Sequence, residues 1–229
     1  MTKLPRLTRS EIERNTVGYY RTAGGTRPDL RVVDLDGVRI IVKDFARSDR
    51  LFRTIVGPLM IRREFGALAK LRGVEGIPRL VGKIDRYALA MEHVPGTSLA
   101  DLEAGVLDAE FYAKMRRVVD TMHSRGVAHC DLRSRGNVML GEDGLPYLVD
   151  FAACVFRGRG INPFFRWLFH QFVLADRNAI VRIKHRLSPE LLTDNERAEA
   201  SRPMPLERPA RFIGHGIRNL TRKLLTRRC

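Results

Sequence analysis

Two aspartates and one asparagine in the second half of the chain have the order and spacing that phosphoryl transfer requires. Asp131 follows His129 and Cys130, Asn137 lies six residues further on, and Asp150 opens an Asp-Phe-Ala tripeptide. One aspartate can orient an acceptor hydroxyl, while a second aspartate and an asparagine can hold the divalent cation that neutralises the phosphates. Each short motif also occurs by chance, so the prediction depends on their order and spacing.

A lysine on a predicted strand and a glutamate on a predicted helix lie upstream. Lys43 ends the β-branched run 38–43, and Asp36-Gly37 before it is a strong hairpin turn signal. Alternation along a strand places Lys43 on the face opposite to the even-numbered residues of this run. Residues 61–71 carry apolar side chains at helical spacing, with Glu64 beside the apolar stripe. We therefore expect Glu64 to reach Lys43 and hold its ammonium group against the phosphates of ATP.

With these residues the chain resembles the protein-kinase-like superfamily, and more closely its small prokaryotic members, the RIO-type and lipopolysaccharide-core kinases. The resemblance runs from about Tyr19 to Val155. It implies an α+β, two-lobed protein-kinase-like fold, with a small antiparallel β N-lobe plus one helix and a reduced helical C-lobe. The N-lobe is expected at 1–94, the C-lobe with its catalytic and metal-binding loops at 95–190, and a linker with a basic amphipathic tail at 191–229.

The resemblance implies roles for the residues of the second half. Asp131 is similar to the catalytic aspartate and Arg133 to the basic residue two positions after it. Asn137 and Asp150 are similar to the two residues that bind Mg2+. His129 is similar to a structural histidine that supports the catalytic loop and the Asp-Phe backbone, so we do not expect it to act as an acid or base.

The same resemblance implies where ATP would bind in the first half. Lys43 is similar to the ATP-contacting lysine and Glu64 to its partner on the helix. Segment 91–96 resembles the hinge of a kinase, where the backbone of Glu92 and Val94 would meet the adenine. The implied cofactors are ATP and Mg2+. No Gly-x-Gly-x-x-Gly loop is present, and residues 22–26 are the nearby candidate for covering the phosphates.

Other departures from the kinase pattern concern the catalytic and metal-binding loops. The interval from Asp131 to Asn137 is one residue longer than the family pattern, so the catalytic loop is expected to bulge near Gly136. Ala152 replaces the glycine of Asp-Phe-Gly, which restricts the backbone there. No Ala-Pro-Glu segment follows Asp150. The longer interval and Ala152 leave open a catalytically weak pseudokinase that serves as a nucleotide-binding scaffold, whereas the missing Ala-Pro-Glu segment argues more against a protein substrate than against ATP.

Net charge is a second signal of function. The 229 residues include 41 Lys and Arg against 26 Asp and Glu, which gives a formal charge of +15. Such a surplus predicts anionic partners. Nucleic acid is the less favoured one, because the chain has no recognisable motif for reading RNA or DNA. Residues 207–229 hold seven Lys and Arg against one Glu, with apolar residues at helical spacing. This tail is interpreted either as an anchor on an anionic membrane or as a helix packed on its own domain.

Aromatic residues are concentrated at 162–174, where four of the eleven Phe and the only Trp lie. The favoured interpretation is a buried C-lobe helix, and the alternative is a helix at a lipid interface. Elsewhere, Glu110 to Arg125 is predicted as a long helix ended by Gly126. Residues before about Arg14 are read as a polar lead-in.

The predicted location is the cytoplasm. Cys130, Cys154 and Cys229 form no paired framework, which suits a reducing compartment. The sequence shows no secretory signal and no apolar run of the ~18 residues that a membrane span needs. The basic tail extends this prediction to a peripheral position on the inner face of the plasma membrane.

The predicted function is an ATP- and Mg-dependent phosphotransferase that transfers the γ-phosphate to a hydroxyl group. The favoured acceptor is anionic: a sugar, a phosphorylated saccharide or a lipid-linked saccharide at the membrane surface. A Ser/Thr protein kinase of RIO-like type, the pseudokinase scaffold and a basic nucleic-acid-binding module are the alternatives.

Overall fold

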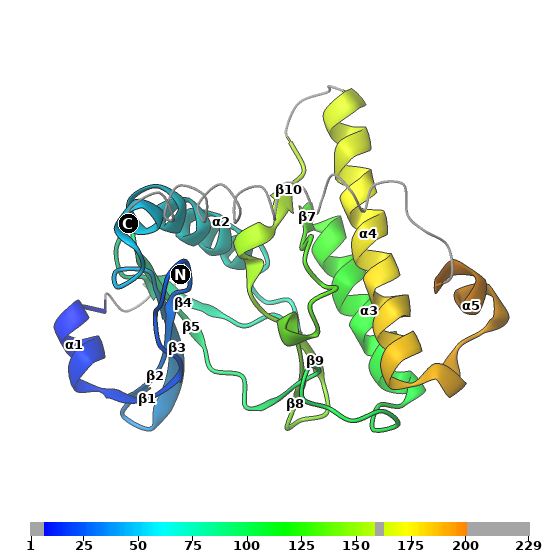
Figure 1. Cartoon of the computed structure of the whole chain (residues 1–229), viewed down its shortest axis with the longest axis horizontal. Coiled ribbons are helices and arrows are strands. Elements are labelled where there is room, and N and C mark those ends of the chain that lie inside the picture. Colours follow the sequence, from blue (N-terminus) through cyan, green and yellow to red (C-terminus); the bar gives the residue numbers. More distant parts are fainter. Residues whose placement is uncertain (1–6, 159–162, 201–229) are drawn as a thin grey trace, which may run out of the picture. The chain divides into compact units, whose positions relative to one another are not determined.

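The computed structural model describes residues 7–158 and 163–200 (Figure 1). The described chain divides into two compact units. The N-terminal unit comprises the described residues up to Arg72 together with Pro78–Val94, and the C-terminal unit comprises Gly73–Ile77 and the described residues from Pro95 onward.

The N-terminal unit is built on a five-stranded antiparallel sheet with the order β1-β2-β3-β5-β4. Its strands are β1 (Thr16–Arg21), β2 (Asp29–Leu35), β3 (Val38–Asp44), β4 (Leu80–Lys83) and β5 (Ala88–Glu92). The turn between β2 and β3 has positive φ angles at Asp36 (53°) and Gly37 (84°). Both angles suit the two-residue hairpin that Asp-Gly predicts.

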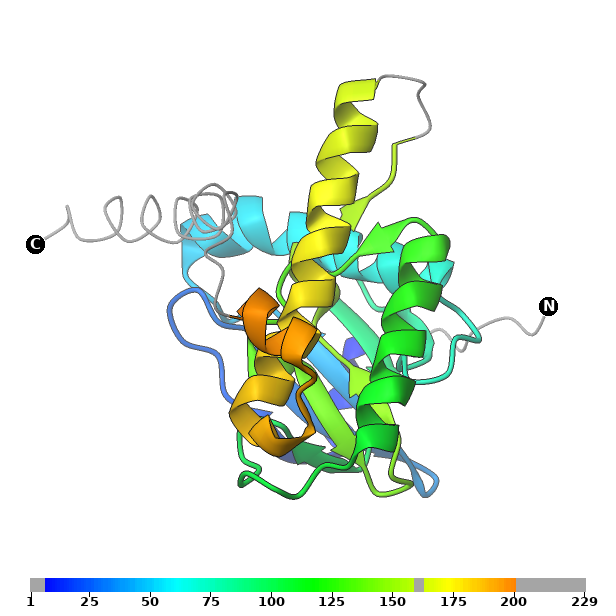
Figure 2. The ribbon, with the colours of Figure 1, turned by 90° about the vertical axis from the view of Figure 1, so that its right-hand side faces the viewer.

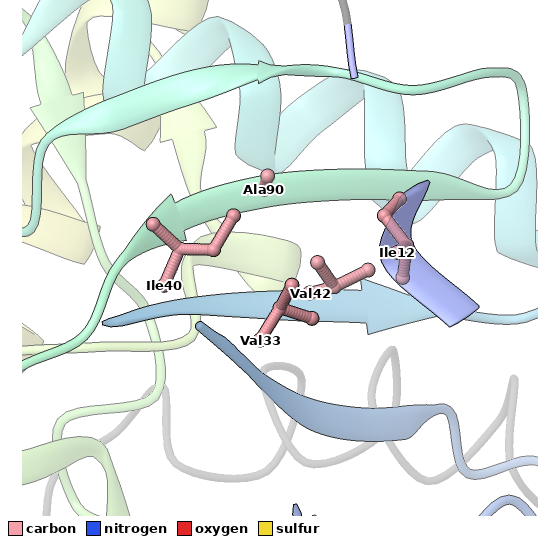
Figure 3. Packing of buried hydrophobic residues seen from close by; sticks show 5 residues of the cluster. All are labelled: Ile12, Val33, Ile40, Val42 and Ala90. Atoms are coloured by element: carbon pink, nitrogen blue, oxygen red, sulfur yellow. The ribbon is translucent and has the colours of Figure 1, made fainter. Parts of the chain in front are cut away.

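A short helix, α1 (Arg9–Arg14), covers one face of this sheet. Ile12 packs there against apolar residues of three strands, namely Val33, Ile40, Val42 and Ala90 (Figure 3). The prediction of a polar lead-in is therefore wrong for these residues. Thr8 and Glu11 form a reciprocal capping box, which is a sequence signal for a helix start.

The opposite face of the sheet carries a π-helical turn, Phe52–Val56, that leads into α2 (Gly57–Lys70). Helix α2 contacts β4 and β5. Ile61 and Leu68 of α2 are buried, as the apolar stripe predicts. Because Ile40 and Val42 face α1, the alternation of β3 directs Lys43 toward α2.

The C-terminal unit contains α3 (Ala109–Ser124) and α4 (Pro163–Leu187), which lie side by side (Figures 1 and 2). Asp108 caps α3 by accepting a hydrogen bond from the amide of Phe111, and Gly126 has a φ of 68° just beyond its end. The prediction of a helix at 110–125 is thus confirmed. A further helix, α5 (Asp194–Ala200), packs on α4.

Two small β ladders hold the loops of the C-terminal unit. Strands β6 (Gly96–Ser98), β8 (Val138–Gly141) and β9 (Pro146–Leu148) form one sheet. Strand β7 (Val127–Ala128) pairs with β10 (Val155–Phe156) in the other. These ladders fix both ends of the segments that carry Asp131 and Asp150.

Two predictions about the end of the chain need correction. The segment from 191 onward was expected to be a linker, yet it contains α5, whose Glu196 accepts a hydrogen bond from Lys184 of α4 at 2.8 Å. The aromatic segment was expected to be buried, yet Phe164, Phe165 and Trp167 are exposed and only the later turns of α4 enter the core. The tail at 207–229 lies outside the described residues.

Among the described residues, no helix combines the length and the apolar character needed to cross a membrane.

Candidate active site

A buried carboxylate of α4 binds the backbone of the segment that leads into Asp131. Asp176 is 2% exposed, and its side chain accepts hydrogen bonds from the amides of His129 (2.7 Å) and Cys130 (2.9 Å). The same carboxylate lies 3.0 Å from Nε2 of His123 on α3. Cys130 has a φ of 68°, a conformation that costs a non-glycine residue about 1–2 kcal/mol. The hydrogen bonds from Asp176 therefore hold a strained backbone directly before Asp131.

Asn137 contacts Asp131 through its side-chain amide. Its Nδ2 donates to the backbone carbonyl of Asp131 at 2.9 Å and to Oδ2 of the same residue at 3.0 Å. The chain between them forms a 3-10 turn, Arg135–Asn137, with Ser134 donating to the Asp131 carbonyl at 3.2 Å. This turn takes up the extra residue without a positive φ at Gly136, so the bulge predicted there takes the form of a regular turn.

Asp150 is tied to the same loop. The amide of Val149 donates to the carbonyl of Asn137 at 2.9 Å, and His129 Nε2 lies 3.0 Å from the carbonyl of Val149. Asp150 itself is left-handed, with a φ of 64°, and caps a 3-10 turn, Phe151–Ala153. His129 must donate through Nε2, because a carbonyl can only accept. It therefore has the supporting role that was expected of it.

The donor set of Asn137 and Asp150 is suited to Mg2+. Because Asn137 uses its NH2 group on Asp131, its amide oxygen is the atom it can offer to a cation. Asp150 adds a partly buried carboxylate, and hard oxygen ligands are what Mg2+ prefers. The described residues contain no group of three or more His, Cys, Asp or Glu arranged to hold a metal. Mg2+ in nucleotide sites is commonly held by one or two protein groups and completes its shell with phosphate and water.

In the N-terminal unit, Lys43 and Glu64 form a buried ion pair. The Lys43 Nζ lies 2.7 Å from Glu64 Oε2, and the two side chains are 4% and 1% exposed. The predicted contact between the strand and the helix is thus present. A buried ion pair adds little stability compared with an apolar pair of similar volume. Its presence here suits a role in holding a cationic group for a ligand.

The segment predicted as the hinge, 91–96, begins with the last two residues of β5. The amide of Glu92 donates to the carbonyl of Arg79 at 2.8 Å, and its carboxylate accepts from the amide of Arg79 at 2.9 Å. The backbone amide of Glu92 is therefore already used, and its carbonyl is the main-chain group that it can offer to a ligand. Tyr20 of β1 stacks on His93, with a ring separation of 5.9 Å and a hydroxyl–Nε2 distance of 2.7 Å. Val94 is buried at the end of the segment.

The glycine-containing loop at 22–26 forms the tip of the β1–β2 hairpin. Asp29 accepts a hydrogen bond from Ala23 at 2.6 Å, and Gly24 pairs with Arg27 across the tip. The carbonyl of Gly25 accepts from the amide of Asp49 at 2.9 Å. These bonds give the loop a defined shape without the glycine pattern of typical kinases.

The family of the chain follows from comparison with known proteins. A protein-family model described as the RIO domain matches residues 42–159, slightly more than half of the chain. The chain belongs to the RIO-domain family. A comparison with curated proteins found no match.

Solved structures confirm the fold of this RIO-domain protein. The Rio2 kinase from Chaetomium thermophilum aligns with a TM-score of 0.59 and 16% identity, covering 88% of this chain and 64% of that chain. The Rio2 kinase–ADP/Mg2+–phosphoaspartate complex from the same organism aligns with a TM-score of 0.59 and 15% identity. This alignment covers 88% of this chain and 63% of that chain. The predicted α+β, two-lobed protein-kinase-like fold is therefore correct. The chain spans less than two thirds of each Rio2 chain.

Two basic residues, Arg133 and Arg135, lie in the loop between Asp131 and Asn137. Arg133 is exposed, two residues beyond Asp131. Arg135 is half-buried, and its guanidinium donates to the carbonyl of Leu99 at 3.3 Å. Arg133 is thus the better placed of the two to meet a charged group from solvent.

One site residue escaped the sequence analysis. Asp176 was not singled out because its two backbone partners lie 46 and 47 positions earlier in the sequence. A signal was nevertheless present: Asp176 lies at helical spacing from two apolar residues, three after Val173 and four before Ile180. A charged residue in such a position needs a buried partner.

Proposed function

We propose that this RIO-domain protein is an ATP- and Mg-dependent phosphotransferase. The observation that carries the proposal is the hydrogen-bonded arrangement of Asp131 and Asn137, with Asp150 fixed to the same loop. The buried Lys43–Glu64 ion pair of the N-terminal unit supports it, because it holds an ammonium group suited to the phosphates of a nucleotide.

Asp131 is the proposed catalytic residue. Asn137 holds Oδ2 of its carboxylate, which fixes the side chain and directs the other oxygen toward an acceptor hydroxyl. The acceptor oxygen bonds to the γ-phosphorus of ATP while the bond from that phosphorus to the bridging oxygen breaks, and ADP leaves. The hydroxyl proton passes to the carboxylate of Asp131.

The remaining residues stabilise charge. Asn137 and Asp150 would hold Mg2+, which when bound neutralises the negative charge on the phosphates. Arg133, exposed beside the loop, would stabilise the transferred group. Lys43 would orient the α- and β-phosphates, and the carbonyl of Glu92 and the amide of Val94 would contact the adenine.

The proposed acceptor is a hydroxyl of a sugar or a lipid-linked saccharide on the inner face of the plasma membrane. The formal charge of +15 supports an anionic acceptor. A serine or threonine of a protein is the alternative hydroxyl. A phosphoprotein product formed with purified proteins, and no product with saccharide or lipid extracts, would establish that alternative.

The activity test compares two substitutions of the same chemistry. Purified wild type, Asp131→Asn and Asp143→Asn are incubated with γ-labelled ATP, Mg2+ and saccharide, lipid or protein fractions. Asp143 is an exposed residue of the same unit whose carboxylate accepts from Tyr147 and the Leu145 amide. We expect transfer by wild type and by Asp143→Asn, with a loss of at least about 100-fold in Asp131→Asn. Equal transfer by all three proteins would refute the assignment of Asp131.

The Rio2 phosphoaspartate complex favours a second product on this chain, an aspartyl phosphate. In that reaction a carboxylate oxygen of Asp131 or Asp150 attacks the γ-phosphorus, ADP leaves, and water later releases phosphate. Labelled protein that loses its label to hydroxylamine would identify an acyl phosphate, whereas a phosphorylated hydroxyl resists hydroxylamine. Binding of ATP with neither product would leave the nucleotide-binding scaffold as the function.

A further inference from the structure

The first turns of α4 carry an exposed aromatic cluster. Phe164 and Phe165 are each 59% exposed and Trp167 is 50% exposed. Phe164 contacts both other rings, with centroid separations of 5.7 Å to Phe165 and 6.0 Å to Trp167. This end of α4 extends beyond the end of α3 in both views (Figures 1 and 2). We call these three residues the α4 aromatic cluster.

The cluster is not part of the core of its unit. Packing of α4 begins two residues after Trp167, where Phe169 and Val173 form a buried group with Ala128. Exposed apolar residues scattered singly are normal on a protein surface, but three contiguous large aromatics indicate an interaction site. The exposed rings therefore form a candidate interaction site.

The charge around the cluster indicates which occupant would suit this site. The 22 residues from Cys154 to Ala175 contain no Asp or Glu but include three arginines. Of these, Arg157 and Arg166 are described and exposed. The next acid, Asp176, is buried and directed into the core. The charged residues that flank the aromatic rings in the sequence are therefore all cationic.

We propose that the α4 aromatic cluster inserts into the interface of an anionic lipid membrane. Trp and Phe rings are stable at the level of lipid headgroups, and arginine can bind lipid phosphates while its stem stays in the apolar region. The proposed contact is peripheral, with the rings at the depth of the headgroups. A second copy of the chain fits less well, because each copy brings the same positive charge. The proposal is independent of the phosphotransferase activity.

The only tryptophan of the chain lies within the cluster, so its fluorescence reports on this site alone. The full chain is mixed with vesicles of phosphatidylcholine, with and without phosphatidylglycerol. We expect the emission of Trp167 to shift to shorter wavelength and to become protected from acrylamide only with phosphatidylglycerol. Brominated acyl chains should quench it. An unchanged spectrum with both vesicle types overturns the proposal.

Substitutions separate the rings from general charge attraction. Phe164→Ser with Phe165→Ser keeps the reporter and should lower vesicle partitioning about 10- to 100-fold, since each half-inserted ring contributes on the order of tenfold. Ile55→Ser with Val106→Ser is the matched control, because both residues are exposed and lie outside α4, at 64% and 56%. The control should bind like wild type. Equal losses in the two double variants would overturn the proposal.

Two further arms test the charge and the other occupants. Replacing Arg157 and Arg166 by serine should weaken binding roughly 30-fold at low salt, at about 1 kcal/mol for each arginine near an anionic surface. A fluorescence shift that depends on protein concentration without vesicles would show self-association and overturn the proposal. The same shift with single-stranded RNA but not with vesicles would also overturn it.

Discussion

The substitution Asp176→Asn tests whether the buried carboxylate of α4 holds the loop before Asp131. Asp176 accepts from the amides of His129 and Cys130 through different oxygens, at 2.7 and 2.9 Å. Asparagine keeps one acceptor and replaces the other by an NH2 group. If its oxygen keeps the His129 amide, the NH2 group faces the amide of Cys130, and two donors then meet in a buried space.

The expected cost follows from these contacts. A hydrogen bond to a charged group contributes about 1.5–3 kcal/mol, and a buried unsatisfied donor costs a further ~1–3 kcal/mol. The change should therefore lower the free energy of unfolding by about 3–5 kcal/mol. The matched control is Asp120→Asn, which also removes a contact between α3 and α4. Asp120 pairs with Arg177 at 2.8 Å, but both side chains are nearly half exposed, so this loss should cost at most about 1 kcal/mol.

Two measurements decide the outcome for Asp176. Urea unfolding followed by circular dichroism gives the free energy of unfolding of both variants. Hydrogen exchange of the peptide that contains His129 and Cys130 gives a local readout, and it should be faster in Asp176→Asn than in wild type and in Asp120→Asn. If the two substitutions cost the same, or if exchange of this peptide is unchanged, the assigned role of Asp176 is wrong.

Three other substitutions test the two units. Lys43→Met should lower the free energy of unfolding by about 3–5 kcal/mol, because it removes the cation that pairs with the buried carboxylate of Glu64. It should also abolish the thermal stabilisation by ATP, because Lys43 is the proposed contact of the phosphates. Gly76→Ala should lower the free energy of unfolding, measured with urea, at least twice as much as Gly73→Ala. The two glycines have similar φ angles, 76° and 78°, but of the two only Gly76 would bring an added Cβ to 2.5 Å from a backbone oxygen. Burial raises the pKa of Asp85, but hydrogen bonds from Arg9 and two backbone amides outweigh it and lower the pKa below its ordinary value. The ion pair should therefore stabilise the fold above the unfolded pKa and lose this contribution as the pH falls through the folded pKa, and Arg9→Met should flatten the acid limb of a thermal stability profile.

Sequence patterns predicted elements whose determinants are local. The turn at Asp36-Gly37 follows from two residue types that tolerate positive φ, and the helix at 110–125 follows from its apolar spacing and the glycine beyond its end. The Lys43–Glu64 ion pair was also predictable. Side chains alternate between the two faces of β3, so Lys43 must lie on the face opposite to Ile40 and Val42. This is the face on which α2 brings Glu64.

The sequence could not show that the first turns of α4 are exposed and the later turns are buried. The aromatic spacing near Trp167 is as helical as the spacing near Val173, so periodicity predicts one apolar stripe along the whole helix. Burial also requires a partner surface. Val173 has such a partner surface, because it packs with Ala128 and Phe169. The first turns of α4 extend beyond the end of α3, so α3 does not cover them (Figure 2). Which part of an apolar helix is covered depends on the lengths of its neighbours, a property that no single segment contains.

Asp176 combines both kinds of information. Its position on an apolar stripe is local and indicates that a buried acid must find donors. The identity of the donors is not local, because they are backbone amides of a loop that precedes Asp176 by more than forty residues. Backbone amides are present at nearly every residue, so the sequence does not mark which two will point at the carboxylate. The left-handed φ of Cys130 removes that ambiguity, since it turns two successive amides toward the same side of the chain. The strained residue before Asp131 and the acid on α4 therefore explain each other: without the carboxylate the loop would lose the hydrogen bonds that offset its strain, and without the loop Asp176 would be a buried charge with only His123 beside it.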